Sequence, residues 1–190
     1  MHKMPVTDYK LIRSRRKTLC IEIRQGQLLV RAPLRASNAE IARFLREKQS
    51  WIEDHLAKAR AREEAKQSVP LLTDAEIRLL AHEAKVLIPD RVAYFARQLN
   101  VAYGRITIRC QRTRWGSCSS RGNLNFNCLL MLAPREVLDS VIVHELCHRK
   151  HMNHSAAFYN EVLRIMPDYR TWDKWLKKNG PLLMARLSHE

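Results

Sequence analysis

The sequence has no hydrophobic run long enough to cross a membrane, because none approaches the ~18–20 apolar residues that a membrane span requires. It also lacks an apolar stretch near its start, where Met1–Pro5 is followed by polar and charged side chains. No internal repeat or low-complexity tract is present. These absences predict a soluble, cytoplasmic protein with no membrane partner.

Closely paired cysteines are missing as well. The five cysteines are an odd number, are widely spread and include no C-x-x-C pair: Cys20, Cys110, Cys118, Cys128 and Cys147. In a cytoplasmic protein we expect all of them to be reduced. Cys147 is adjacent to His148 and on a helix would point about 100° away from it. We therefore interpret Cys147 as a small buried hydrophobe and not as a metal ligand.

Acidic residues are few, at 19 Asp and Glu against 34 Lys and Arg, which gives a formal net charge of +15. Such a balance favours anionic partners such as nucleic acid, nucleotides or acidic surfaces. The basic residues are spread along the chain, however, without aromatic-interleaved basic motifs or zinc-finger spacing. Polyanion association is therefore a hypothesis, and a solvated basic surface is its alternative.

The apolar fraction of 46% is ample for a core and argues against global disorder. At 190 residues we expect one compact domain, or a domain with a small appendage. The polar stretch 63–68, followed by Val69 and Pro70, is typical of a linker. We therefore predict a β-hairpin and helix part at 1–68 and a core at 69–190, unless the two form one continuous domain.

Residues 8–33 show the alternation of strands, with a hairpin turn at Gln25-Gly26-Gln27. A basic cluster precedes the hairpin: Arg13, Arg15, Arg16 and Lys17. We interpret it as a solvated face, with anion binding as the alternative.

Two capping boxes predict long helices. Ser37 and Glu40 open one to about Arg62, with Trp51 on its apolar face. The pair of Thr73 and Glu76 opens another to about Gln98, bent or interrupted near Pro89.

Residues 104–133 return to a strand pattern, in which Leu124, Phe126 and Cys128 alternate with asparagines. Such a strand is half-buried, and its polar face, with Asn125 at its centre, is a candidate substrate wall. Pro134 suits the first turn of a following helix. Two more helices are expected at about 155–166 and 170–178.

The motif His144-Glu145-Leu146-Cys147-His148 lies on that following helix. Residues four apart share one helix face, so His144 and His148 can offer ring nitrogens to one metal ion at ~2.0–2.1 Å. Glu145 lies one residue along, where its carboxylate reaches a metal-bound water instead of the metal.

A third ligand is needed, and His151 and His154 are the candidates. On a continuing helix His151 would lie ~10.5 Å from His144 along the axis, too far to bind the same ion. His154 requires the helix to end and the chain to reverse. Asn153 tolerates the left-handed conformation of a helix end, and Ser155 can cap a following helix. We therefore predict His154 as the ligand and keep His151 as the alternative.

The competing interpretation is a chance pattern on a His-rich surface helix. The apolar residues before and within the motif argue against it: Val141, Ile142, Val143 and Leu146. They indicate a buried helix, in which two histidines and a glutamate must find polar partners. A metal ion supplies them.

Together with Arg112–Cys118 and the Asn-rich strand, this motif resembles the YgjP-like (DUF45) family of zincin-type metal hydrolases, which is related to the WLM and SprT-like metallopeptidases. The resemblance runs from the basic cluster to Pro167-Asp168-Tyr169. It implies an α+β, zincin-like fold with a β-rich N-terminal part and a metal-hydrolase core at 69–190. It also implies His144, His148 and His154 as metal ligands with Glu145 as base. His151 stands where metzincins carry a glycine, which argues against a metzincin proper.

The chemistry agrees with the resemblance. Three neutral histidines leave one position open on a single Zn²⁺ or other divalent ion, where a bound water has a pKa of about 7. Glu145 takes its proton and returns it to the leaving group. Arg114 is a candidate for stabilising the oxyanion, and Arg112 and Arg114 serve equally well as structural pairs for carboxylates. Because zincins hold substrate along an edge strand, 123–130 is the candidate strand.

Peptide hydrolysis is the leading functional hypothesis. The first alternative is hydrolysis of a phosphoanhydride such as a nucleoside triphosphate, which the net charge and the arginines favour. The second is a non-catalytic, nucleic-acid-associated module with a structural metal. An Arg-lined pocket beside the metal would favour nucleotides, and an open groove beside an unpaired strand would favour peptides.

Overall fold

The computed structural model describes residues 8–24 and 26–187. These residues form two compact units, one ending at Ser68 and the other beginning at Val69. Each unit has its own hydrophobic core. None of the described helices is long and apolar enough to span a membrane.

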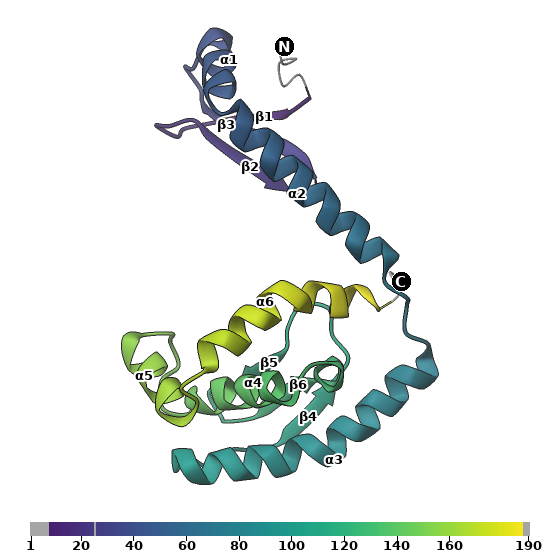
Figure 1. Ribbon diagram of the computed structural model, residues 1–190. Coiled ribbons are helices and arrows are strands. Elements are labelled where there is room, and N and C mark those ends of the chain that lie inside the picture. Colours follow the sequence, from purple (N-terminus) through teal and green to yellow (C-terminus); the bar gives the residue numbers. More distant parts are fainter. Residues whose placement is uncertain (1–7, 25, 188–190) are drawn as a thin grey trace. The chain divides into compact units, whose positions relative to one another are not determined.

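The N-terminal unit contains a three-stranded sheet (Figure 1). Its strands are β1 (Lys10–Ser14), β2 (Cys20–Arg24) and β3 (Gln27–Pro33), in the order β1-β3-β2. The predicted hairpin is present, because β2 and β3 are antiparallel and Gly26 adopts a positive φ of 74° in the turn. Gln25 of that turn lies outside the described residues. β1 pairs in parallel with β3, which the sequence did not predict.

The single helix predicted after this sheet is in fact two helices, α1 (Asn38–Glu47) and α2 (Gln49–Ser68). The capping box of Ser37 and Glu40 is confirmed at the start of α1. The chain breaks at Lys48, whose φ of −101° and ψ of 9° are not helical. α2 continues past the predicted end at Arg62, because Glu, Ala and Lys at 63–68 are good helix formers. The polar stretch predicted as part of a linker is therefore helical up to Ser68.

The core of the N-terminal unit lies between β3 and the two helices. Leu28, Val30 and Ala32 of β3 pack with Ile41, Leu45 and Ile52. Trp51 was expected in this core, but its side chain is 42% exposed and stacks on His55 at 4.0 Å. Because Ile52 fills the adjacent position with no exposure, Trp51 is turned outward on α2.

The C-terminal unit begins with α3 (Asp74–Leu99), which the predicted capping box of Thr73 and Glu76 opens. Pro89 lies inside this helix without ending it. A proline costs a helix one backbone hydrogen bond, and the full burial of Ile88 and Val92 on either side offsets that cost. Asn100 ends the helix in the left-handed conformation, with φ 52°.

A second three-stranded sheet follows, made of β4 (Ile106–Arg109), β5 (Gly116–Cys118) and β6 (Leu124–Asn127). The order is β4-β6-β5, so β6 is paired on both sides. The prediction that 123–130 forms an edge strand is therefore wrong. Cys128–Leu132 is a 3₁₀ helix, η1. Within the described residues, β4 and β5 are the two outer strands, and each pairs only with β6.

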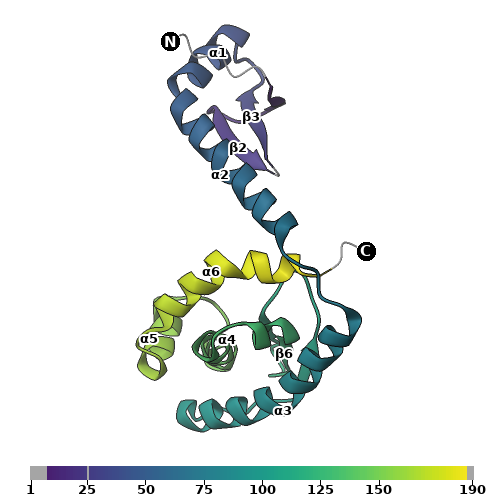
Figure 2. The same cartoon turned by 45° about the vertical axis from the view of Figure 1, so that its right-hand side comes forward.

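The motif helix α4 (Arg135–Cys147) runs through the middle of the C-terminal unit. Figure 2 views α4 nearly end-on, with α3 on one side and α6 on the other. α5 (Ala156–Ile165) and β5 also contact α4. The last helix, α6 (Tyr169–Ala185), extends well beyond the predicted end at 178. The expected α+β class is confirmed, with a small sheet packed on the motif helix.

Candidate metal centre

Three histidines meet where α4 ends and α5 begins. His144 lies in the last turn of α4, His148 caps its C-terminus, and His154 immediately precedes Ser155, the N-cap of α5. Their ligand atoms all lie within 4.8 Å of one another. The Nε2 atoms of His144 and His154 are 3.0 Å apart. The structure thus brings the three predicted ligands together.

The chain reversal that joins them occurs earlier than predicted. α4 ends at Cys147, and a turn follows in which the amides of Lys150 and His151 both donate to the Cys147 carbonyl. Asn153 was expected to take the left-handed conformation, but among the described non-glycine residues only Asn100 has a positive φ. Ser155 does cap α5, as predicted, by accepting from the Phe158 amide.

His151 takes part through its backbone and not through its ring. Nδ1 of His148 donates to the His151 carbonyl oxygen at 3.0 Å. A carbonyl can only accept, so this bond fixes the proton of His148 on Nδ1 and leaves Nε2 unprotonated. His148 is thereby held in the tautomer that a metal requires.

Two aromatic residues that the sequence did not single out support the cluster. Phe158, which is fully buried, lies under all three histidine rings, with centroid distances of 5.0, 4.8 and 4.9 Å to His144, His148 and His154. The hydroxyl oxygen of Tyr169 lies 2.9 Å from Nδ1 of His144. Phe158 lies four residues after His154, and this spacing could have indicated that the two side chains are neighbours. Tyr169 could have been found from the family resemblance, which extends to Pro167-Asp168-Tyr169.

Burial favours the neutral form of His144 and His148. Burial, together with the neighbouring rings of His148 and His154, lowers the pKa of His144 to about 4. Burial likewise lowers the pKa of His148. Near neutral pH both rings are therefore uncharged and have a lone pair available for a cation.

Glu145 is buried, with 6% of its surface exposed, and burial raises the pKa of its carboxyl group to about 7. The side chain lies against Gly116 of β5, where an added Cβ would be 2.7 Å from Glu145 Oε1. A carboxyl group that titrates near neutral pH has the proton affinity of a general base.

The donor set fits a divalent transition metal. Two ligands at ~2.1 Å with a tetrahedral angle between them lie roughly 3.4 Å apart, close to the His144–His154 separation. Each of His144 and His148 uses its Nδ1 for another contact and points Nε2 away from it. Neutral imidazoles in such an arrangement are ligands for zinc and its neighbours in the first transition row.

The predicted substrate residues lie on β6 and on the loop before β5. Asn125 donates to the Ser117 hydroxyl at 3.1 Å, across the β5–β6 pair. Arg112 and Arg114 are exposed on the loop before β5. Neither forms an ion pair with another described residue. Asn127 holds this loop, because its amide donates to the carbonyls of Gln111 and Arg114 at 2.6 and 2.9 Å.

A small cavity of about 130 Å³ adjoins His144 and Glu145. Ser140, Val141, Tyr169, Asp173 and Leu176 complete its lining. Among the described residues that line it there is no lysine or arginine. The one further charged group is the carboxylate of Asp173, which is paired with Lys177 at 2.6 Å.

Comparisons with known proteins bear on this centre. The model of the YgjP-like family, described as a metallopeptidase domain, matches residues 17–83 and 71–179. The crystal structure of the metallopeptidase zymogen abylysin from Pyrococcus abyssi is 20% identical, with a TM-score of 0.44 over 48% of this chain and 94% of that chain. For jannalysin from Methanocaldococcus jannaschii, also a metallopeptidase zymogen, the identity is 24% and the TM-score 0.44, over 48% and 95% of the two chains. No curated protein matches.

The family model covers both units and includes every residue of the histidine cluster. The resemblance noted in the sequence is therefore confirmed, and the chain belongs to the YgjP-like family, whose members carry a metallopeptidase domain.

Proposed function

We propose that this protein is a zinc-dependent peptidase in which His144, His148 and His154 hold the metal and Glu145 is the general base. The single observation that carries the proposal is the unpaired edge of β5 beside Glu145. Family membership supports a metal-dependent hydrolase, and the features below support peptide as its substrate.

When bound, a zinc ion supplies a Lewis acid and lowers the pKa of a coordinated water to about 7. Glu145 accepts a proton from the attacking water and passes it to the leaving amine. Its burial and its pKa of about 7 suit both steps. Tyr169 accepts a hydrogen bond from Nδ1 of His144 and so keeps Nε2 directed at the metal.

β5 is the strand on which an extended peptide would bind. Antiparallel pairing with β6 uses one side of β5, and the other side offers backbone donors and acceptors to a further strand. Gly116 at its start brings the backbone against Glu145 without a side chain between them. A peptide added to this edge would have a bond to be cleaved close to the base and the histidines.

The surroundings of the centre give less support to a nucleoside triphosphate as the substrate. A polyphosphate requires several cations, because each phosphate carries at least one negative charge. The cavity beside His144 and Glu145 has an aspartate in its wall and no arginine among the described residues. Peptide hydrolysis is therefore the function that the site favours.

A hydrolysis screen tests this proposal. Purified protein is incubated with a mixed peptide library or an unfolded protein, and separately with nucleoside triphosphates, and the Glu145→Gln variant is the blank in both. We expect peptide cleavage that falls about 10²–10⁴-fold in the variant while its metal content is unchanged. Nucleotide hydrolysis that depends on Glu145, with no peptide cleavage, would contradict the proposal.

A further inference from the structure

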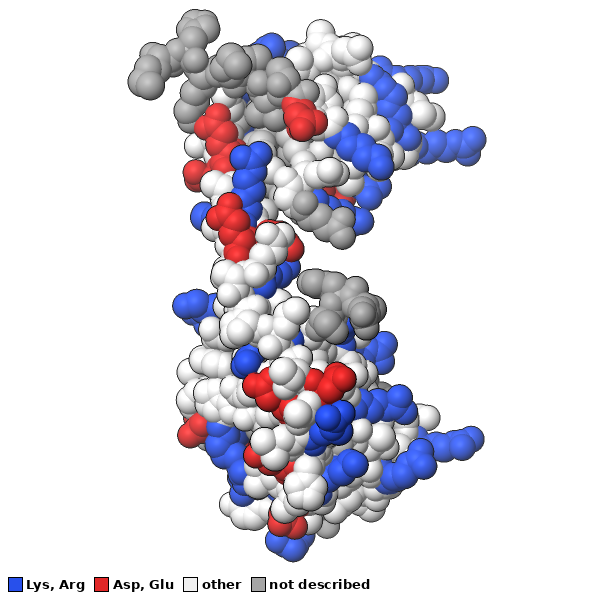
Figure 3. Space-filling model, turned by 90° about the vertical axis from the view of Figure 1, so that its right-hand side faces the viewer, with Lys and Arg blue, Asp and Glu red and all other residues white. Residues whose placement is uncertain are grey.

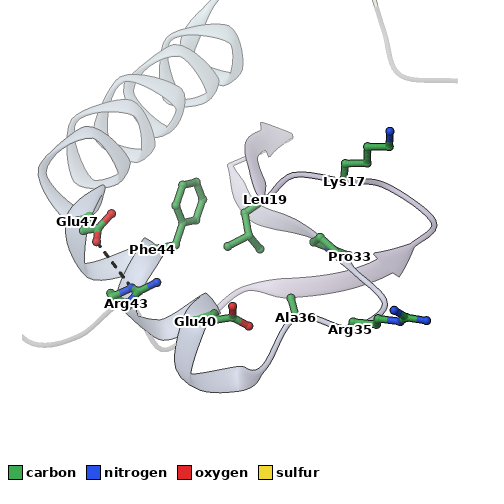
Figure 4. Close-up of a pocket in the computed structure, with 9 residues that line it drawn as sticks. All are labelled: Lys17, Leu19, Pro33, Arg35, Ala36, Glu40, Arg43, Phe44 and Glu47. Atoms are coloured by element: carbon green, nitrogen blue, oxygen red, sulfur yellow. Dashed lines mark ion pairs between the residues drawn. The ribbon is translucent and has the colours of Figure 1, made fainter.

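The N-terminal unit carries an open hollow between its sheet and α1 (Figure 4). The volume of the hollow is about 520 Å³, within the range of pockets that hold a small organic ligand. Its lining combines apolar and charged side chains: Lys17, Leu19, Pro33, Arg35, Ala36, Glu40, Arg43, Phe44 and Glu47. None of these residues belongs to the metal centre.

The two carboxylates in the wall are already engaged. Glu40 accepts from the backbone amide and the hydroxyl of Ser37 in the capping box. Glu47 lies 4.0 Å from Arg43, and Figure 4 draws this pair as a dashed line. Lys17 and Arg35 are exposed at the rim opposite α1, with their charged ends directed outward in Figure 4 and no ion pair to any described residue. Glu40 keeps its negative charge in the capping box, so the three cations and two carboxylates of the lining leave a formal charge of about +1.

The unit as a whole reinforces this sign. Residues 1–68 contain sixteen Lys and Arg against eight Asp and Glu. Figure 3 shows several blue basic side chains along one side of this unit. Such a charge excess raises the local concentration of a polyanion.

The floor of the hollow is apolar. Phe44, Leu19, Pro33 and Ala36 supply the apolar part of the lining (Figure 4). Phe44 is half-buried, so part of its ring remains available in the hollow. A ligand that satisfies this site has an anionic part for Lys17 and Arg35 and a flat apolar part for Phe44.

We propose that this hollow binds one nucleotide of a single-stranded nucleic acid, with its phosphates at Lys17 and Arg35 and its base against Phe44. Phosphate matches the fork of an arginine, and bases stack on aromatic rings without regard to sequence. In a duplex the bases are stacked inside the helix and cannot enter such a hollow. An acidic peptide has the charge but lacks a flat ring at each anionic group.

The proposal is tested by fluorescence anisotropy. The full-length protein is titrated against a labelled, single-stranded oligothymidylate of twelve nucleotides. The pocket variant is Lys17→Ala with Arg35→Ala. The matched control is Lys58→Ala with Arg62→Ala, which removes the same charge from exposed positions of α2 in the same unit. All four side chains are exposed, and unchanged thermal unfolding shows that each variant is folded.

We expect the pocket variant to bind at least tenfold more weakly and the control less than twofold more weakly. The slope of log affinity against log salt should decrease in magnitude by about 1.4 in the pocket variant, because two phosphate contacts are lost. Phe44→Leu should weaken binding about fivefold with an unchanged slope, since it removes stacking and no charge.

Three results would overturn the proposal. Equal weakening of the pocket and control variants would mean that binding is spread over the basic surface. A duplex of the same length that binds as tightly as the single strand would remove the role of the base. Polyglutamate that competes as well per charge would show that any polyanion suffices. The anisotropy assay detects neither metal content nor peptide cleavage. Its outcome is therefore independent of the proposed function of the metal centre.

Discussion

Gly116 determines how closely β5 approaches the carboxylate of Glu145. A methyl group at this position would lie 2.7 Å from both Cγ and Oε1 of Glu145, so the buried carboxylate would have to move. We predict that Gly116→Ala lowers peptide hydrolysis about 10–100-fold, because a displacement near 1 Å is enough to misalign a base. The metal content, measured by elemental analysis, should not change, because the three atoms nearest to the added methyl group all belong to Glu145. Full activity would show that the position of Glu145 is not critical.

Tyr169 orients His144 from the side opposite the cluster. The Tyr169→Phe variant keeps the ring, which is 6% exposed, and removes only the hydroxyl group near Nδ1. Loss of such an outer contact should weaken metal affinity about 10–100-fold, measured by competition with a chelator. Tyr94→Phe, at an exposed tyrosine of α3, is the control and should leave the affinity unchanged. Equal affinity in the two variants would make Tyr169 a packing residue only.

At this scale the sequence predicted the cluster, because helix geometry relates His144 to His148. His151 was set aside on the assumption of a continuing helix, whereas α4 ends at Cys147. The residues that hold the cluster were harder to predict. Phe158 and Tyr169 come from helices whose packing on α4 is a tertiary feature. The role of His151 as a backbone acceptor for His148 has no signature in a residue pattern.

The carboxylate of Glu161 helps to hold the segment between α4 and α5 in place. Glu161 of α5 pairs with Lys150 of this segment and with Arg164. These hydrogen bonds, first from Arg164 and then from Lys150, lower the pKa of Glu161 to about 2. His154 lies in the same segment, so the ion pair helps to fix the third ligand.

This pKa predicts a dependence of stability on pH. A carboxylate whose pKa is below its ordinary value of 4.5 stabilises the fold fully above pH 4.5, and the contribution is lost as the pH falls toward 2. The wild-type protein should therefore lose more unfolding free energy between pH 5 and pH 3 than Glu161→Gln, measured by denaturant titration. Glu83→Gln, at an exposed glutamate of α3, should behave as wild type. Equal losses in the wild type and Glu161→Gln would remove the ion pair from the account.

The helix starts at Ser37, Thr73 and Ser155 followed from local capping chemistry, and the structure confirms them. Strand order did not, because pairing joins residues far apart in the sequence. β6 was predicted to be an edge and is central. The asparagine face of that strand was interpreted as a substrate wall, yet Asn127 is fully buried and supports the loop before β5.

At the scale of the whole molecule, the two hydrophobic cores share no residue. One core comprises residues from Leu28 to Ile52, and the other comprises residues from Leu72 to Leu187. All three histidines, Glu145 and β5 belong to the second unit. The chain ends of this unit are joined to each other, because the Leu72 amide donates to the Arg186 carbonyl at 2.8 Å.

We therefore predict that a fragment of residues 69–190 folds and holds about one metal ion. Circular dichroism and elemental analysis of the fragment check this expectation, with the full-length protein as the reference. A fragment that is unfolded or metal-free would show that the metal centre requires the N-terminal unit.

We propose that three histidines hold one catalytic metal ion. Elemental analysis and peptide cleavage, measured on the same purified sample before and after chelation, test it most directly. We predict about one zinc ion per chain, loss of cleavage when the ion is removed, and recovery when zinc is returned. The His148→Ala variant should contain no metal and cleave nothing. Metal-free protein that still cleaves peptides, or a His148→Ala variant with its full metal content, would contradict the account.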